Sequence, residues 1–276
     1  MVDGIDFKSA YWNSRLKPGI KGGRTVGNIL ITGGSRGMGR AVALKFAKEG
    51  HNVAVTYEKN RKAADEVVSQ VKALGRDALA LPMDIGRPEG IDAAFDAFEK
   101  HFGEMDYLFN NVGVFLGLKP LTGQTWQDWE KILRVNVIGQ WYCTRRAVLN
   151  MAKNGGGSIV YNSSISGTVA FPNAADYAAS KHAVVGMVKG HAIECAPLKI
   201  RVNGICPGFF KTDMFDEYFG AAEEYFSKSK IPARRIGNVE EMASLAYWLL
   251  VEGTYCYGEN IVFDGGMTIG PIAVPE

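Results

Sequence analysis

Cysteine is scarce in this sequence and follows no recognisable pattern. The chain of 276 residues has four cysteines, none in a C-x-x-C pair and none at a metal-ligand spacing from the four histidines. A disulfide framework and a zinc site are therefore not expected. The four residues, Cys143, Cys195, Cys206 and Cys256, are instead typical of reduced and mostly buried thiols in a cytoplasmic protein.

Excess charge and long apolar runs are also missing. The 31 Lys and Arg residues nearly balance the 29 Asp and Glu residues, the formal net charge is +2, and the basic residues are scattered. This argues against a nucleic-acid partner. No stretch approaches eighteen consecutive apolar residues, and the start of the chain has no apolar leader pattern. We therefore expect neither a membrane-spanning helix nor secretion, and we expect the protein in the cytoplasm.

Glycine, in contrast, is abundant, with 33 residues. Gly33, Gly37 and Gly39 follow an apolar strand expected at residues 28–32 and precede a helix expected at 40–48. Such a unit binds dinucleotides, because glycines let the backbone approach the pyrophosphate and the helix N-terminus favours its negative charge. The spacing differs from G-x-G-x-x-G, and a turn needed only for packing is the alternative. No G-x-x-x-x-G-K-S/T pattern supports an ATP-type P-loop.

A stretch just past the middle of the chain carries the candidate chemistry. Residues 158–162 predict a buried strand, and an alanine-rich helix is expected shortly after it. Tyr177 and Lys181 are four residues apart and share one face of that helix. Because an ammonium group favours a nearby phenolate, we expect a lowered pKa for Tyr177, useful for proton transfer. Ser163 and Ser164, at the strand end, could bond a substrate oxygen, although one such Tyr–Lys spacing is expected by chance.

Strands and helices alternate along the rest of the chain. Apolar strands, each followed by a helix, indicate a parallel sheet covered on both faces, that is, a doubly wound α/β (Rossmann) fold. No linker or second core is visible, so we expect one domain over residues 28–276, with a substrate lid at about 209–231 and an N-terminal extension at 1–27. The further strands are expected at residues 51–57, 78–81, 105–109, 200–205 and 260–263, and the further helices at 63–74, 91–102, 126–151, 173–195 and 239–251.

In this order the motifs resemble those of the short-chain dehydrogenase/reductase family, and the resemblance covers about residues 28–267. Each motif is weak alone, but the combination is specific, with Ser164 thirteen residues before Tyr177. Val112 stands where alanine is usual in the family, a mild departure near the expected cofactor. The motifs are the loop at 32–39, Asp84, residues 110–113, Asn136, Ser164, residues 177–181, Pro207, Gly208 and Thr212.

The resemblance implies an oxidoreductase that moves a hydride between a nicotinamide coenzyme and a secondary alcohol/ketone pair. Tyr177 would be the general acid in reduction and the general base in oxidation. Lys181 would lower its pKa and hold the nicotinamide ribose hydroxyls, while Ser164, rather than Ser163, would orient the substrate oxygen. Asn136 would kink the long helix and fix a water that links Lys181 to a proton path. An epimerase or dehydratase on the same scaffold is the alternative, and a dinucleotide sensor is disfavoured because no catalytic group is lost.

The choice between NADP and NAD depends on the residues near the glycine loop. Arg36 lies inside the loop, where similar NADP enzymes carry a base, and Asn60 and Arg61 are within reach of a 2′-phosphate. Tyr57 rather than an acid ends the second strand, and Glu58 would serve an NAD enzyme. We favour NADP, with NAD as the alternative. The cofactor-binding residues implied by the resemblance are Gly33, Ser35, Arg36, Gly37, Met38, Gly39, Tyr57, Asp84, Ile85, Asn111, Gly113, Tyr177, Lys181, Pro207, Gly208 and Thr212.

The resemblance also implies where three residues lie around the coenzyme. Asp84 would meet the adenine, although an aspartate at a strand exit is equally a turn residue. Asn110 would close the strand end beneath the cofactor. Thr212 would bond the nicotinamide amide after the turn at Pro207 and Gly208.

The substrate pocket is expected beyond the strand ends, in residues 114–118, 165–173 and 209–226. The last segment is unusually rich in Phe and Tyr, and a small helix that packs on the core accounts for about half of these rings. The remaining rings suit an apolar, mobile lid over a hydrophobic or ring-containing ketone or alcohol. Similar reductases that act on carrier-protein thioesters tend to have basic residues near the active-site mouth. The matching residues here, 153–157 and 195–198, offer little beyond Lys153, which weighs against a carrier-protein substrate.

Assembly is the last expectation from the sequence. Enzymes of this family are usually tetramers, built by pairing long helices and by pairing the last strand and helix. Large apolar patches are uncommon on monomers, so aromatic residues beyond one buried face support a homotetramer, with a dimer as the fallback. The alternative is that these rings lie against the sheet or under the N-terminal extension. The residues concerned are Trp126, Trp129, Leu133, Trp141, Tyr142, Tyr247 and Trp248.

Overall fold

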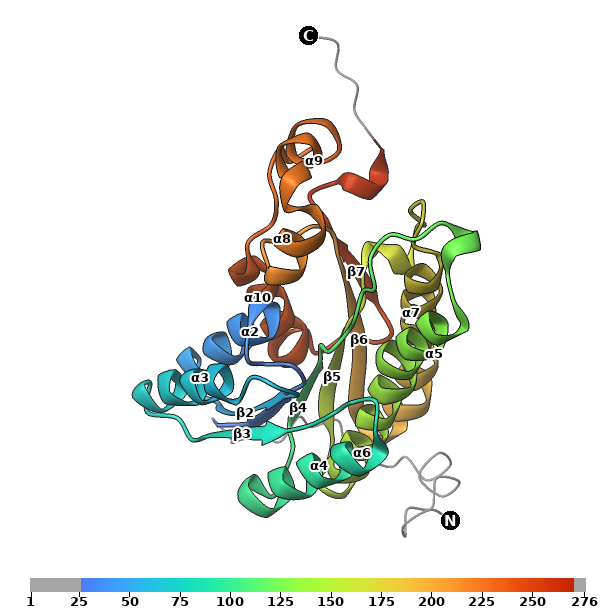
Figure 1. The fold of residues 1–276 in the computed structure, drawn as a ribbon. Helices are drawn as coiled ribbons and strands as arrows, with labels where there is room; N and C mark the ends of the chain where they lie inside the picture. The colour runs from blue at the N-terminus through green and yellow to red at the C-terminus, as the bar shows by residue number, and fades with distance from the viewer. Residues whose placement is uncertain (1–25, 271–276) are drawn as a thin grey trace.

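The computed structural model describes residues 26–270, which form a parallel sheet between two layers of helices (Figure 1). The sheet has seven strands in the order β3-β2-β1-β4-β5-β6-β7, and every neighbouring pair is parallel. The doubly wound fold expected from the sequence is thereby confirmed. Nearly all of the expected N-terminal extension, residues 1–25, lies outside the described residues. The strands are β1 (Asn28–Ile31), β2 (Asn52–Tyr57), β3 (Ala78–Pro82), β4 (Tyr107–Asn110), β5 (Gly157–Asn162), β6 (Ile200–Pro207) and β7 (Asn260–Phe263).

Each face of the sheet has its own core and its own set of helices, as Figure 1 shows. One face is covered by α2 (Gly37–Lys48), α3 (Arg61–Ala73) and α10 (Val239–Tyr247). The other face is covered by α4 (Pro88–Phe102), α5 (Trp126–Leu133), α6 (Gln140–Lys153) and α7 (Ala175–Cys195). Among the described residues, no helix is both long enough and apolar enough to cross a membrane.

Strand residues reach the two cores in alternation. On β1, Ile29 and Ile31 lie in the core beneath α2, while Leu30 lies in the core beneath α4. On β5, Val160 lies in the core beneath α2 and Tyr161 lies in the core beneath α4. Successive side chains of a strand point to opposite faces, so a strand covered on both sides must be apolar throughout. This is why these strands read as continuous apolar runs in the sequence.

The long helix expected at residues 126–151 is divided into three parts. Between α5 and α6 the chain forms a π-helical segment, Arg134–Gly139, and Asn136 lies within it. Gly139 lies against the segment that follows β3, so closely that an added Cβ would lie 2.3 Å from the Ile85 carbonyl oxygen. π-Helical turns usually mark functional positions in helices. A π-helical segment therefore interrupts the long helix at Asn136, and the kink expected there stays a prediction.

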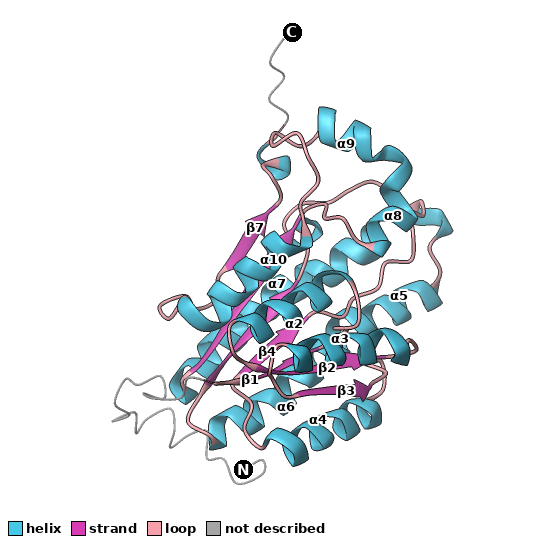
Figure 2. Ribbon diagram, turned by 90° about the vertical axis from the view of Figure 1, so that its left-hand side faces the viewer, coloured by secondary structure: helices cyan, strands magenta, loops and turns pink. Residues whose placement is uncertain are grey.

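A small helical segment lies past the end of β6, in the range where the sequence predicts a substrate lid, and we call it the lid after that prediction. It contains α8 (Asp213–Phe219) and α9 (Glu223–Ser229), and both views show α9 projecting beyond the strands (Figures 1 and 2). Four of its phenylalanines pack into a separate cluster with Ile231 and Ile236: Phe209, Phe215, Phe219 and Phe226. Half or more of the lid rings therefore hold the lid together, which matches the expectation that packing accounts for many of them.

Candidate active site

The candidate site lies where the carboxyl ends of the central strands meet. β1 has β2 on one side and β4 on the other, and this reversal of strand order is where doubly wound sheets bind their ligands. The glycine loop after β1 enters this region. Gly33 has a φ of +66°, and a Cβ on Gly39 would lie 2.4 Å from the Gly33 carbonyl oxygen. Both positions therefore require glycine, as expected from the sequence.

The glycine loop is tied to the end of β4 by hydrogen bonds. Thr32 Oγ1 accepts from the backbone N–H groups of Asn111 (2.8 Å) and Val112 (3.1 Å). Asn111 Nδ2 donates to the carbonyl oxygens of Thr32 (3.0 Å) and Gly33 (3.3 Å). The helix that follows, α2, begins without a side-chain cap at Arg36, so its first N–H groups are left for another acceptor. These features fit the pyrophosphate of a dinucleotide.

The three candidate catalytic side chains converge between β5 and α7. Ser164 follows the end of β5, Tyr177 lies in the first turn of α7, and Lys181 lies one turn later. Lys181 Nζ donates to the Asn162 carbonyl oxygen (3.1 Å) and lies 5.6 Å from the centroid of the Tyr177 ring. Ser163, the rival of Ser164, donates its hydroxyl to the Lys181 carbonyl oxygen (3.1 Å) and so holds the helix.

The acid–base properties differ in one respect from the expectation. Burial raises the pKa of Tyr177 to about 12, and a hydrogen bond with Ser164 opposes this rise. The expected lowering is therefore wrong for this structure, because desolvation of the buried phenol is the dominant effect on its pKa. Burial lowers the pKa of Lys181 to about 8. At neutral pH the site thus presents a protonated phenol beside a lysine that is still mostly charged.

Asn136 joins the π-helical segment to the loop after β4. Its Oδ1 accepts from the Val114 N–H (2.7 Å), and its Nδ2 donates to the Val114 carbonyl oxygen (2.9 Å) and to Ser180 Oγ (3.1 Å). A Cβ on Gly113 would lie 3.2 Å from Lys181 Nζ and 3.5 Å from Asn136 Oδ1, so both side chains border the same residue. The side chain of Asn136 therefore positions the loop that faces Lys181, and the expected water stays a prediction.

Other expected cofactor residues have structural roles of their own. Asp84 Oδ1 accepts from the Gly86 N–H (2.9 Å), which makes it a turn residue whatever else it contacts. Asn110 is fully buried beneath the strand end, where its Nδ2 donates to Thr144 Oγ1 (3.2 Å). Thr212 caps α8 by accepting from the Phe215 N–H (3.2 Å). The sequence reasoning did not foresee this cap, although Thr before Asp is a usual helix start.

The end of β6 and the glycine loop meet at the start of the lid. Gly208 packs so tightly that an added Cβ would lie 2.7 Å from the Asp264 Cβ, and Pro207 ends the strand beside it. A Cβ on Gly37 would lie 3.6 Å from Thr212 Cγ2. Ser35 and Met38 belong to the same loop, with Met38 Sδ 3.5 Å from the side-chain amide of Asn162. The structure thus brings the loop, the strand end and Thr212 together.

Residues that bear on coenzyme choice lie at the surface. Arg36 is largely exposed, and its guanidinium pairs with Asp213 at the start of the lid (3.2 Å). Glu58 is exposed after Tyr57, the last residue of β2, and pairs with Lys59 (3.7 Å). Both side chains are therefore accessible to a coenzyme, Arg36 to the 2′-phosphate of NADP and Glu58 to the ribose 2′-hydroxyl of NAD.

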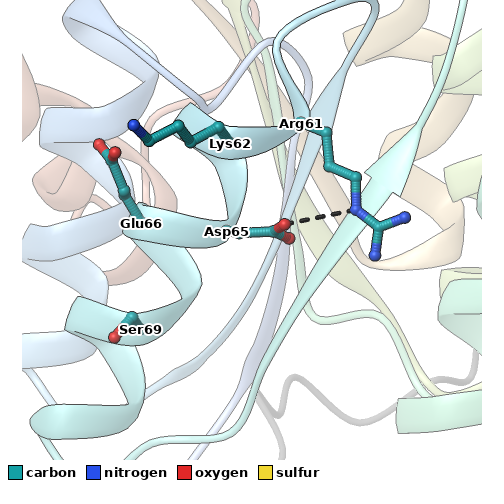
Figure 3. A pocket seen from close by; sticks show the side chains of 5 residues that line it. All are labelled: Arg61, Lys62, Asp65, Glu66 and Ser69. Carbon is teal, nitrogen blue, oxygen red and sulfur yellow. Dashed lines mark hydrogen bonds and ion pairs between the residues drawn. The ribbon is translucent and has the colours of Figure 1, made fainter.

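Arg61, also considered for a 2′-phosphate, is occupied along its own helix. Its Nε lies 3.3 Å from an Asp65 carboxylate oxygen. Figure 3 shows this pair in a pocket on α3 that Lys62, Glu66 and Ser69 also line. The pocket has charged walls of both signs, and none of its residues belongs to the catalytic group.

An aromatic wall borders the candidate catalytic tyrosine, Tyr177, and we define the wall as Phe115, Tyr218 and Phe219. The Phe115 ring lies edge-on to Tyr177, with centroids 5.2 Å apart. It also contacts Tyr218 (4.9 Å) and Phe219 (5.9 Å), and the Tyr218 hydroxyl donates to the Phe115 carbonyl oxygen (3.3 Å). The sequence placed Phe115 only within a pocket-forming segment. Its contact with Tyr177 depends on two loops that are far apart in the chain.

Comparisons with known proteins agree with this geometry. A family model described as enoyl-(acyl carrier protein) reductase matches residues 33–268. The 3-oxoacyl-[acyl-carrier-protein] reductase of Staphylococcus aureus is 34% identical over 87% of this chain and 97% of its own. The 3beta-hydroxysteroid dehydrogenase 1 of Eggerthella lenta is 34% identical over 88% of this chain and 94% of its own.

A solved structure supports the same grouping. The gluconate 5-dehydrogenase of Burkholderia cenocepacia, in complex with NADP and tartrate, has a TM-score of 0.82 and 30% identity, covering 88% of this chain and 96% of its own. Fold and site together define a dinucleotide-binding α/β oxidoreductase. The chain belongs to the short-chain dehydrogenase/reductase family and is an NAD(P)-dependent enzyme that acts on CH–OH groups.

Proposed function

We propose that the protein moves a hydride between NADP(H) and a secondary alcohol/ketone pair whose substrate is hydrophobic or ring-containing. The observation that carries this proposal is the aromatic wall of Phe115, Tyr218 and Phe219 beside the Tyr177 ring. A pocket lined by aromatic rings with a few polar groups selects apolar substrates and fixes them by those polar groups. Here the polar groups are the hydroxyls of Tyr177 and Ser164.

The proposed mechanism assigns one task to each side chain. The coenzyme supplies or accepts the hydride when it is bound. Ser164 orients the substrate oxygen, and Tyr177 donates its phenolic proton to that oxygen in reduction and takes it back in oxidation. Lys181, charged at neutral pH, stabilises the tyrosinate that forms and binds ribose hydroxyls. Asn136 holds the loop that faces Lys181 and so keeps the two groups in place.

Arg36 supports the preference for NADP. Its guanidinium projects from the glycine loop, and its ion-pair partner, Asp213, is also largely exposed. Exposed pairs of this kind contribute little, so a 2′-phosphate can replace the carboxylate at small cost. A relative of known structure binds NADP, which agrees with this assignment. Glu58, which would serve NAD, is directed to Lys59. The proposed adenine contact remains with Asp84 and Ile85, and the proposed amide contact with Thr212.

A 3-oxoacyl thioester is the second candidate substrate, because the family model and one relative carry carrier-protein names. The sequence analysis considered the neighbourhood of Lys153 for a carrier protein, and Arg146 lines the same surface pocket as Lys153. Arg146 forms ion pairs with Asp92 (2.5 Å) and Asp96 (2.7 Å) and has little charge to offer an acidic partner. Lys153 remains in that region, so the comparison has to be made by experiment.

A coenzyme and substrate screen tests the proposal. Cyclic and linear ketones, the matching alcohols and a 3-oxoacyl thioester are each offered with NADPH or NADH, or with the oxidised forms, and the absorbance of the reduced nicotinamide is followed. We expect the highest kcat/KM with NADPH and a ring ketone. A higher kcat/KM for the thioester would replace the proposed substrate class, and a native preference for NADH would point to Glu58.

We further propose a cytoplasmic homotetramer. The four cysteines are free thiols, which suits a reducing compartment. On the first divided helix, Trp126 is 81% exposed, Ile138 56% and Trp141 44%, and on the last helix Trp248 is 43% exposed. Such rings gathered on two surfaces suit closed symmetric interfaces.

Two other rings of the expected set are partly buried by contacts within the fold. Tyr247 packs on Phe46 with centroids 5.1 Å apart, and the Tyr142 hydroxyl donates to Asp92 (3.0 Å). They therefore add less to an interface than the sequence suggested. Light scattering at micromolar concentration tests the assembly. A fully active monomer of 30.1 kDa would overturn it.

A further inference from the structure

Asn162, the last residue of β5, leaves one buried polar atom without a partner. The side chain is 8% exposed, and its Oδ1 has no hydrogen-bond donor among the described residues. Buried acceptors are normally paired, because an unpaired one loses the hydrogen bonds it would make with water. Four other buried side-chain atoms of the described residues are also unpaired: Ser158 Oγ and Asn260 Oδ1 at the beginnings of β5 and β7, Gln140 Oε1 at the start of α6, and Arg76 Nε after α3. Asn162 lies at the other end of β5, where the coenzyme is expected.

The hydrogen-bond network fixes which atom of the Asn162 amide is unpaired. Asn111 Nδ2 donates to the carbonyl oxygens of Thr32 and Gly33, so Asn111 Oδ1 must face the opposite way. That oxygen accepts from Asn162 Nδ2 (2.9 Å). Exchanging the two ends of the Asn162 amide would place two oxygens against each other. Oδ1 is therefore the unpaired atom.

The position of Asn162 restricts the donor that it can meet. Its backbone carbonyl accepts from Lys181 Nζ (3.1 Å), and its side-chain amide lies 3.5 Å from Met38 Sδ in the glycine loop. It therefore lies between the loop that fits the pyrophosphate and the lysine expected to bind the nicotinamide ribose. A pyrophosphate has no hydrogen-bond donor at neutral pH. The nicotinamide riboside has several, in its carboxamide N–H₂ and its ribose hydroxyls.

We propose that Asn162 Oδ1 accepts a hydrogen bond from the nicotinamide riboside of the bound coenzyme. Asn162 is then a coenzyme-positioning residue that connects three parts of the site. Its backbone holds Lys181, its Nδ2 holds Asn111 and through it the glycine loop, and its Oδ1 holds the reacting half of the coenzyme. This inference rests on the proposed function, because it requires that a nicotinamide coenzyme binds at all.

The test is direct binding of the whole coenzyme and of its adenine half. Wild-type protein is titrated with NADP⁺ and NAD⁺, and the tighter ligand is compared with its adenine half, 2′-phospho-AMP or AMP. Asn162→Leu removes the acceptor with little change in volume. We expect it to weaken the whole coenzyme about ten-fold, or ~1.4 kcal/mol, and to leave the adenine half unchanged. Asn162→Ser, which cannot overpack the site, should behave in the same way.

Ser158→Ala is the matched control, because it removes an unpaired hydroxyl from the opposite end of the same strand. It should leave the affinities of both ligands unchanged. Unaltered coenzyme affinity in both Asn162 variants would overturn the proposal, and so would an equal loss for both ligands, which indicates a disturbed glycine loop. If the wild-type protein bound neither coenzyme, the proposed function itself would fail, and this inference would fail with it.

Discussion

The catalytic group and the lid are built on opposite principles. Ser164 is 9% exposed and Lys181 3%, and both are held by hydrogen bonds to backbone atoms between a central strand and a long helix. The lid has its own small cluster, and its ion pairs are exposed, such as those of Lys211 with Asp216 and Glu223, each 2.7 Å. Exposed pairs contribute little to stability, so the small cluster is what holds the lid together. In the proposed function the core fixes the chemistry and the lid borders the substrate.

The largest loss of activity is expected from a substitution in the core, at Tyr177. Tyr177→Phe keeps the ring and its contact with Phe115 but removes the phenolic proton. We expect kcat to fall by roughly 10²–10⁴-fold, with coenzyme affinity and melting temperature preserved. Steady-state kinetics, a coenzyme titration and a thermal melt measure the three quantities. Turnover close to that of the wild type would show that a group other than Tyr177 moves the proton. The assignment of the chemistry to the core would then be wrong.

The next largest effect concerns the contact between glycine loop and lid. If Arg36 binds a 2′-phosphate, Arg36→Ala should weaken NADP⁺ by about 1.5–3 kcal/mol and leave NAD⁺ nearly unchanged. Arg61→Ala is the matched control, because that guanidinium already bonds Asp65. Titration of all three proteins with both coenzymes gives the answer. Equal losses for the two coenzymes in Arg36→Ala would mean that Arg36 contacts a group that they share.

A smaller effect is expected in the aromatic wall. Phe115→Leu removes the ring contact with Tyr177, and such contacts contribute about 0.5–1.5 kcal/mol, which corresponds to a two- to ten-fold change. We expect this loss in kcat/KM for a ring ketone and little change for a short linear ketone. Phe210→Leu, whose ring packs on Phe263 with centroids 5.6 Å apart in the main core, should affect both ketones equally. If Phe115→Leu affected both ketones alike, the wall would only support the fold.

The smallest effect is a pH dependence from Lys181. Since burial lowers its pKa to about 8, the protonated fraction falls about three-fold between about pH 7.5 and 8.5. Coenzyme binding that uses the ammonium group should weaken by the same factor as the pH rises. Lys181→Met should bind more weakly at every pH and lose this dependence. A wild-type affinity that stays constant over this range would indicate that the charge of Lys181 is not used in binding.

The sequence predicted the parts of this molecule that depend on local pattern. Gly33 and Gly39 are required by backbone geometry, and Tyr177 and Lys181 share a face because helical spacing demands it. These features could be read without knowing any distant neighbour. The same holds for the strands, whose two-sided burial makes them apolar throughout.

The features that the sequence did not predict depend on contacts between distant segments. The raised pKa of Tyr177 reflects burial by loops that a helical spacing does not show. The unpaired oxygen of Asn162 follows from the orientation of Asn111, which is set by the glycine loop. Tyr247 looked like interface surface, but it packs on Phe46 from another helix. In each case the missing information is the placement of one element against another.

The central claim is that the core transfers a hydride between coenzyme and the carbon of an alcohol/ketone pair. The most direct test uses reduced coenzyme that carries deuterium at the transferable position, together with the best ketone from the screen. Mass spectrometry of the product should find deuterium on the carbinol carbon, with one coenzyme oxidised for each product formed. Product that lacks the deuterium, or that forms with no net oxidation of the coenzyme, would contradict the account and favour an epimerase or dehydratase.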